Sequence, residues 1–244
     1  MVSRETLREW RAGFSDAWTV GLGLVPLGLA FGLLITQSGF SWWWAPILSL
    51  VIYAGSMEFL AIGMITAGVG IIPAAVTGFM VNFRHIFYGL TFPRHLIRNF
   101  WARAYSTYAL TDESYAIVSA RAAAGDGHRM TASRMLSIQV VCQLAWVLPG
   151  IIGALAGTAL PDTITGMDFA LTALFLVLAW ESFASHRDVS LPLSAGLFAV
   201  AFALLLPDHM LVLALVCYFC LLLIRFLSPR IDALLHTDLD KARR

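Results

Sequence analysis

The sequence predicts an all-α membrane protein: a polytopic transmembrane helical bundle of seven or eight helices, which can include broken helices and an internal repeat. Of its 244 residues, 59% are hydrophobic and only 13% are charged, against about 25% charged residues in an average soluble domain. A helix that crosses a hydrocarbon core of about 30 Å needs about 20 apolar residues. Runs without Asp, Glu, Lys or Arg cover residues 17–57, 59–83, 135–161 and 189–207.

Apolar segments can be placed in order along these runs. The first follows a group of arginines, and the second begins at Trp42, Trp43 and Trp44, because indole rings favour the membrane interface. A loop around Asp162 and a turn at residues 207–209 separate later segments. We expect helices at residues 15–36, 44–66, 69–91, 133–157, 166–184, 190–206 and 209–227.

A more polar segment covers residues 101–121. Its aromatic residues Trp101, Tyr105 and Tyr108 recur at helical spacing, and Asp112 and Glu113 interrupt it. The segment either spans the membrane inside the bundle or lies along the interface.

Basic residues indicate the topology, because Lys and Arg concentrate on the cytoplasmic side. They cluster before residue 12, at Arg121, Arg129 and Arg134, and again within residues 225–244. These clusters predict a multi-pass protein of the cytoplasmic (inner) membrane with both termini in the cytoplasm. Residues 1–227 then form one transmembrane domain, and residues 228–244 form a cytoplasmic tail. Eight spans put Arg94, Arg98 and Arg103 outside, unless the third segment re-enters rather than crosses.

Several function classes are excluded at this stage. The formal net charge of +1 gives no basic surface for nucleic acid. The motifs H-E-x-x-H and G-x-S-x-G are absent, so we expect no enzyme, no metal and no cofactor. The cysteines Cys142, Cys217 and Cys220 lie in apolar runs and are interpreted as packing residues.

Glu58 is the clearest candidate for chemistry. It lies near the middle of the segment 44–66, where an ionised group costs about 2.5–3.5 kcal/mol on insertion scales. We predict a proton-coupling role. The alternatives are a polar contact between helices, or displacement towards the interface by a break at Gly55-Ser56.

A second candidate group, Asn82, Arg84 and His85, lies late in the segment 69–91. A guanidinium can hold a carboxylate through two parallel hydrogen bonds, so Arg84 is a candidate for substrate binding. His85 is a candidate proton relay, because its ordinary pKa lies near physiological pH. An interfacial anchor for Arg84 and a structural role for His85 are the alternatives.

Asp112 and Glu113 are further candidates for proton coupling. They follow Thr111, and a hydroxyl followed by carboxylates is typical of a helix N-terminus. A broken helix could combine capping with chemistry. Gln143, Asp162, Asp168 and Glu181 are weaker candidates and are interpreted as structural.

An internal symmetry concerns glycine and proline. Pro26 precedes Gly28 and Gly32, and Pro149 precedes Gly153 and Gly157 at the same spacing. Helices interrupted by Gly or Pro in corresponding halves of a transporter point to its binding site. The alternative is ordinary close packing of membrane helices through small residues.

Four blocks of sequence resemble the AzlC family, the large subunits of branched-chain amino-acid export permeases, and most closely its BrnFE-type exporters. The blocks are VPLGLAFG at residues 25–32, YAGS at 53–56, VNFRHIFY at 81–88 and TDESYA at 111–116. The resemblance implies a secondary transporter that exports leucine, isoleucine, valine and often methionine in exchange for protons. It also implies a small AzlD-type membrane subunit as partner.

We combine the resemblance with the residues in one hypothesis of alternating access. Arg84 faces the carboxylate of the amino acid near mid-membrane, and Glu58 or Asp112 exchanges a proton. A passive channel and a non-transporting structural subunit remain the alternatives. The expected substrate-binding residues are Gly28, Gly32, Gly55, Ser56, Asn82 and Arg84, and the expected proton-coupling residues are Glu58, His85, Asp112 and Glu113.

Overall fold

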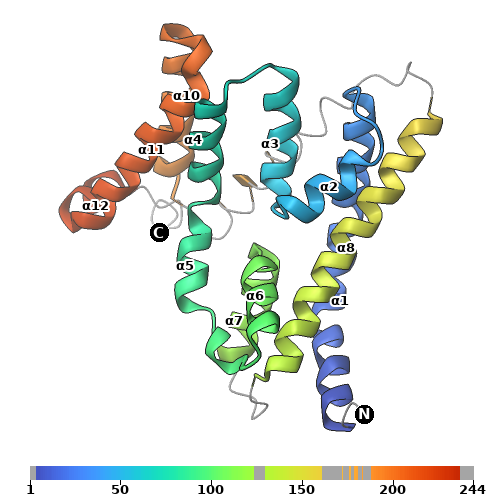
Figure 1. Cartoon of the computed structure of the whole chain (residues 1–244). Coiled ribbons are helices and arrows are strands. Elements are labelled where there is room, and N and C mark those ends of the chain that lie inside the picture. Colours follow the sequence, from blue (N-terminus) through green and yellow to red (C-terminus); the bar gives the residue numbers. More distant parts are fainter. Residues whose placement is uncertain are drawn as a thin grey trace, which may run out of the picture. The chain divides into compact units, whose positions relative to one another are not determined.

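The computed structural model describes residues 4–123, 130–160 and 188–236, together with residues 172, 176, 179, 180 and 183. This part of the chain is built from helices (Figure 1), which confirms the predicted all-α class. Within it, the helices α1 (Arg4–Gln37), α8 (Ala132–Ala159) and α11 (Met210–Leu227) are long and apolar enough to cross a membrane. Most of the expected segment 166–184, with Asp162, Asp168 and Glu181, lies outside the described residues.

Three expected segments are each broken into two shorter helices. The predictions of single helices at 44–66 and 69–91 are therefore wrong, although broken helices as a class are confirmed. Apolar periodicity does not reveal such a break, because the freed backbone groups are satisfied by contacts with distant residues. The pairs are α2 (Trp44–Val51) with α3 (Gly55–Thr66), α4 (Ile71–Asn82) with α5 (Arg84–Thr91), and α6 (Phe100–Tyr108) with α7 (Asp112–Ala123).

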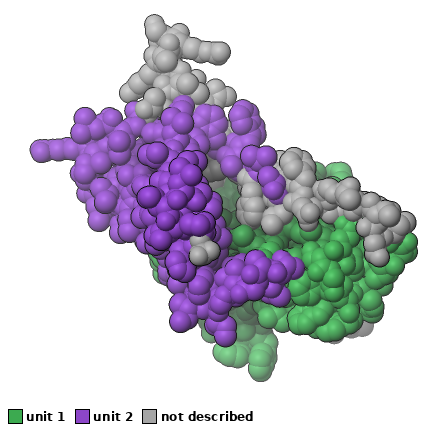
Figure 2. Space-filling view, turned by 90° about the horizontal axis from the view of Figure 1, so that it is seen from above, with its two compact units in different colours: residues 1–63, 82–168 green, residues 64–81, 169–244 purple. Residues whose placement is uncertain are grey.

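The described residues divide into two compact units, coloured separately in Figure 2. The first, unit 1, contains residues 1–63 and 82–168, and the second, unit 2, contains residues 64–81 and 169–244. Unit 1 holds α1, α2, the first part of α3, α5, a short 3₁₀ helix η1 (Arg94–Leu96), α6, α7 and α8.

Unit 1 is organised around α1 and α8, which lie side by side and run in the same direction (Figure 1). α1 begins at Arg4, well before the expected start at residue 15, because no residue between 4 and 15 breaks the helix. A Cβ added at Gly32 would collide with the backbone of Gly150 and Ala154, and one added at Gly153 would collide with the backbone of Leu29. Glycine therefore permits the close approach of the two helices.

Charged residues gather at the end of this pair where both helices begin. The buried carboxylate of Asp16 accepts from Arg134 at 2.6 Å and pairs with Arg121 at 2.8 Å. Close by, the Thr131 hydroxyl donates to Glu9 at 2.9 Å. Two of the predicted basic clusters thus lie at one end of the helix pair.

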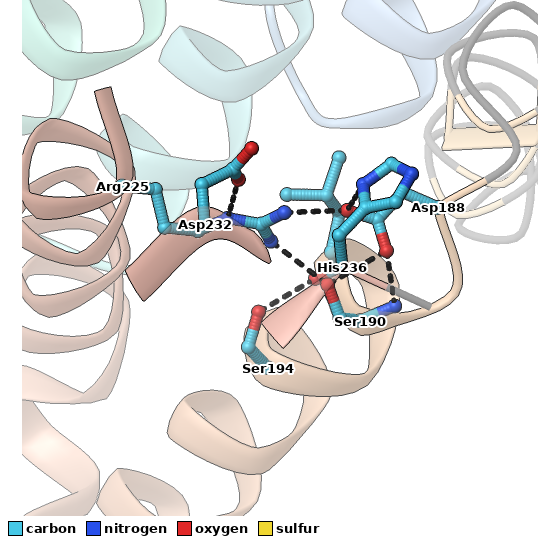
Figure 3. Close-up of polar contacts among 7 residues, drawn as sticks. Asp188, Ser190, Ser194, Arg225, Asp232 and His236 are labelled. Carbon is cyan, nitrogen blue, oxygen red and sulfur yellow. Dashed lines mark hydrogen bonds and ion pairs between the residues drawn. The ribbon is translucent and has the colours of Figure 1, made fainter. Parts of the chain in front are cut away.

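Unit 2 contains α4, α10 (Ser190–Leu205), the short η2 (Pro207–His209), α11 and α12 (Pro229–Leu235). α10 and α11 expose many large apolar side chains, as lipid-facing helices do. α12 is held by the polar cluster in Figure 3, in which the buried Arg225 donates to Asp188 at 2.6 Å and to Asp232 at 2.7 Å. His236 contacts the same Asp188 at 3.1 Å, so this cluster joins α11, α12 and the start of α10.

Candidate functional site

The α2–α3 break surrounds the carboxylate of Glu58. α2 ends at Val51, Tyr53 has a left-handed φ of 42°, and α3 begins at Gly55. A Cβ on Gly55 would come within 3.0 Å of the Trp146 ring, so the glycine lets that ring lie over the break. The break falls just before the predicted Gly55-Ser56 pair and places Glu58 in the first turn of α3.

Glu58 is fully buried, and its carboxylate accepts hydrogen bonds from three groups. The backbone N–H of Ala54 donates to Oε1 at 3.1 Å, the Ser49 hydroxyl donates to Oε2 at 2.8 Å, and the Trp146 indole N–H lies 3.1 Å from both oxygens. No cation pairs with this carboxylate among the described residues. Because the Ser49 hydroxyl can also accept, the pocket can hold Glu58 in either protonation state.

The α6–α7 break meets the α2–α3 break. The hydroxyl of Tyr108, the last residue of α6, donates to the carbonyl of Leu50 at 2.6 Å, and its ring lies 5.7 Å from the ring of Tyr53. Tyr108 therefore satisfies a carbonyl near the C-terminus of α2, which has no partner within that short helix. α6 and α7 have 9 and 12 residues, which span about 14 and 18 Å. Neither of them crosses a bilayer alone.

One face of α8 supports both breaks. Gln139 donates to the carbonyls of Ser106 at 2.8 Å and Ala109 at 3.3 Å, which terminate α6. Gln143 accepts from Tyr105 at 2.8 Å and donates to the Tyr108 hydroxyl at 3.1 Å. Together with Trp146 they recur at helical spacing, close to the middle of this membrane-length helix. The two breaks thus lie near the centre of α8.

Three buried oxygen atoms at the α6–α7 break have no hydrogen-bond partner within the described part of the chain. They are Ser106 Oγ, Thr111 Oγ1 and Gln139 Oε1, on residues that are 1%, 8% and 0% exposed. Thr111 directly precedes α7, so the predicted helix start is confirmed, yet its hydroxyl does not cap the helix. Unpaired buried acceptors such as these can receive hydrogen bonds from a ligand or from water.

Arg84 and Asp112 form a half-exposed ion pair in unit 1. Arg84 Nε donates to Asp112 Oδ1 at 2.8 Å, and Arg84 Nη2 contacts Oδ2, so the guanidinium holds the carboxylate through two parallel bonds. The rings of Tyr88 and Tyr115 stack at 4.3 Å beside this pair. α5 therefore presents to α7 the kind of fork that was predicted for a substrate carboxylate.

The other predicted residues occupy varied places. The His85 ring contacts the Asn82 carbonyl at 3.1 Å, within one turn of the chain. Glu113 is half-buried in the first turn of α7. Gly28 and Gly32 lie against α8, as the packing alternative expects, and their role in substrate binding stays a prediction.

Several residues of this site were not predicted as functional residues from the sequence. These residues form hydrogen bonds at the breaks and carry no charge. They are Ser49, Tyr105, Tyr108, Gln139 and Trp146. The available signal was the recurrence of Gln139, Gln143 and Trp146 on one helical face inside a charge-free run.

The part of the chain that contains the two breaks is similar to known proteins. The family model described as AzlC protein matches residues 19–160, which include both breaks. A membrane protein of Helicobacter pylori is 29% identical over 87% of this chain and 96% of its own length. Inner membrane protein YgaZ of Escherichia coli is 30% identical over 76% of this chain and 77% of its own. Branched-chain amino acid transport protein AzlC of Bacillus subtilis is 29% identical over 73% and 69%. No solved structure matches the chain.

Proposed function

The chain belongs to the AzlC family of membrane proteins, and we propose that it is the large subunit of a two-component secondary transporter. It exports leucine, isoleucine, valine and methionine across the cytoplasmic membrane by exchange for protons, together with a small AzlD-type subunit. The name of the Bacillus subtilis relative, branched-chain amino acid transport protein AzlC, supports this substrate class. Broad selectivity is expected, because one methylene in an apolar pocket discriminates by only about 1–3 kcal/mol.

The meeting of two broken helices near the centre of α8 is the observation that carries the proposal. Helix ends inside a membrane leave backbone donors and acceptors that intact helices do not offer. Transporters use such ends to bind the charged groups of their substrates. In this chain the α6–α7 break adds the unpaired oxygens of Ser106, Thr111 and Gln139, which suit the ammonium group of an amino acid.

Arg84 binds the substrate carboxylate in this mechanism, and Asp112 occupies the same fork when the substrate is absent. The ion pair between them supports this assignment, since a free carboxylate can replace that of Asp112 without changing the geometry. Protonation of Asp112 would release Arg84 and favour substrate binding. A proton at that position would travel with the substrate, which is the wrong direction of coupling for an antiporter.

Glu58 is therefore the residue that we assign to proton exchange. Its carboxylate is fully buried and has no cation partner within the described residues, so an ammonium ion and a proton each offset the same uncompensated charge. Competition between the two gives the exchange that export requires. Ser49 and Trp146 hold the group in place while it changes charge.

Vesicles that contain both subunits test the proposal. Leucine flux down its gradient should drive an opposite proton flux in wild type, Arg84→Ala should abolish leucine flux, and Glu58→Gln should abolish the proton flux. Glu5→Gln, which changes an exposed carboxylate of α1, is the control. Undiminished coupled flux in both site variants would reject the assignment and leave a purely structural subunit.

A further inference from the structure

A cavity of about 380 Å³ opens in unit 1 where the chain passes from η1 into α6. Its lining residues are Arg94, His95, Phe100, Arg103, Ala104 and Thr107. The lining thus combines two permanent positive charges with a histidine, and it contains no carboxylate. The export mechanism above does not use it.

The basic residues of the cavity are not neutralised by the rest of the described chain. Neither arginine forms an ion pair there, and both side chains belong to exposed residues. Phe100 is the first residue of α6, so the positive end of this nine-residue helix adjoins the same cavity. Arginine forks and a helix N-terminus together favour a phosphate group.

Exposed apolar side chains on the lining residue Phe100 and on its sequence neighbour Trp101, and on Leu96 after His95, indicate what carries that phosphate. Phe100 is 63% exposed, Trp101 is 78% exposed and Leu96 is 38% exposed. An indole ring such as that of Trp101 favours the headgroup level of a bilayer, and apolar side chains such as those of Phe100 and Leu96 can contact acyl chains there. A free phosphate ion has no use for them, whereas a phospholipid brings acyl chains to the same place.

We propose that this cavity binds the headgroup of an anionic phospholipid, with Arg94 and Arg103 on its phosphate and Phe100 beside its acyl chains. The bound lipid fixes η1 against the start of α6. The proposal also gives a role to the arginines 94 and 103, whose position the topology prediction did not explain.

The test compares the thermal unfolding midpoint of the purified full chain in detergent with added phosphatidylglycerol, phosphatidylcholine or inorganic phosphate. Phosphatidylglycerol should raise the midpoint of wild type, while the other additions should not. In the double variant Arg94→Ala/Arg103→Ala the half-saturating concentration of phosphatidylglycerol should rise by about tenfold or more, as expected when charge-assisted bonds are lost.

Arg98→Ala is the matched control, because Arg98 is an exposed arginine between the two that does not line the cavity. It should respond to phosphatidylglycerol as wild type does. If Arg98→Ala raised the half-saturating concentration of phosphatidylglycerol as much as the double variant does, the attraction to anionic lipid would be nonspecific. If phosphatidylcholine raised the unfolding midpoint of wild type as much as phosphatidylglycerol does, the effect would be solvation of the apolar surface. An equal rise with inorganic phosphate would indicate an ion site. Each of these three outcomes overturns the proposal. Circular dichroism and gel filtration of the double variant establish that it remains folded.

Discussion

Two substitutions of Glu58 should separate its charge from its hydrogen bonds. In Glu58→Gln, the amide oxygen can take the place of Oε1 and accept from Ala54 and Trp146, as Oε1 does at 3.1 Å. The amide nitrogen can take the place of Oε2 and donate to the Ser49 hydroxyl, which rotates to accept. All three partners are retained, so the free energy of unfolding should change by less than about 1 kcal/mol.

Glu58→Leu has a similar size but accepts nothing. The Ala54 N–H and the Trp146 indole N–H are then left buried without a partner, while the Ser49 hydroxyl can turn to another acceptor. An unpaired buried donor costs about 1–3 kcal/mol, so two of them predict a loss of about 2–6 kcal/mol.

Unfolding by titration with sodium dodecyl sulfate in mixed micelles, followed by tryptophan fluorescence, measures both free energies. Equal destabilisation by Gln and Leu would refute the hydrogen-bond geometry given above for Glu58. Equal transport defects in the two variants would not refute that geometry, because both variants lack the carboxylate.

Three further predictions concern the helix contacts and the ion pair. Gly32→Ala should lower the thermal unfolding midpoint, because its Cβ meets the α8 backbone and overpacking costs about 1–3 kcal/mol; Gly23→Ala on the same helix meets nothing within 4 Å and should not lower it. Tyr108→Phe leaves the Leu50 carbonyl unpaired and should reduce the free energy of unfolding by about 0.5–1.5 kcal/mol, and an unchanged value would argue against the contact between the breaks. Asp112→Asn should lower the KM for leucine, because the neutral amide competes less well for Arg84. Arg84→Lys should raise the KM about tenfold, because lysine cannot form the two parallel hydrogen bonds. A raised KM in Asp112→Asn would contradict the competition between Asp112 and the substrate.

Much of the fold follows from patterns that the chain carries locally. Long apolar segments predict α1, α8 and α11, and the glycines that permit close approach of α1 and α8 are visible as a spaced pattern around Gly32 and Gly153. Thr111 followed by acidic residues correctly indicates the start of α7. Each of these signals depends on neighbours within a few turns of the same helix.

The arrangement of the site depends instead on contacts between distant residues. Glu58 was predicted as a site residue because an ionised group in an apolar run costs free energy. Its partner Trp146 is 88 residues away, and no local pattern indicates that contact. Tyr108 and Leu50 are 58 residues apart and likewise give no signal of their own. Asp16 was overlooked because it stands at the edge of an apolar run, where a charge appears inexpensive, although its carboxylate is buried between Arg121 and Arg134.

The most direct test of the proposed exchange mechanism measures proton movement per leucine in vesicles that contain both subunits and the Glu58→Gln variant. Exchange of labelled for unlabelled leucine should persist, because the hydrogen bonds at the break are retained, but it should need a higher leucine concentration, because the ammonium group loses its counter-charge. Leucine flux should no longer move protons. Wild-type proton movement per leucine in this variant would contradict the assignment of Glu58 as the exchanging group.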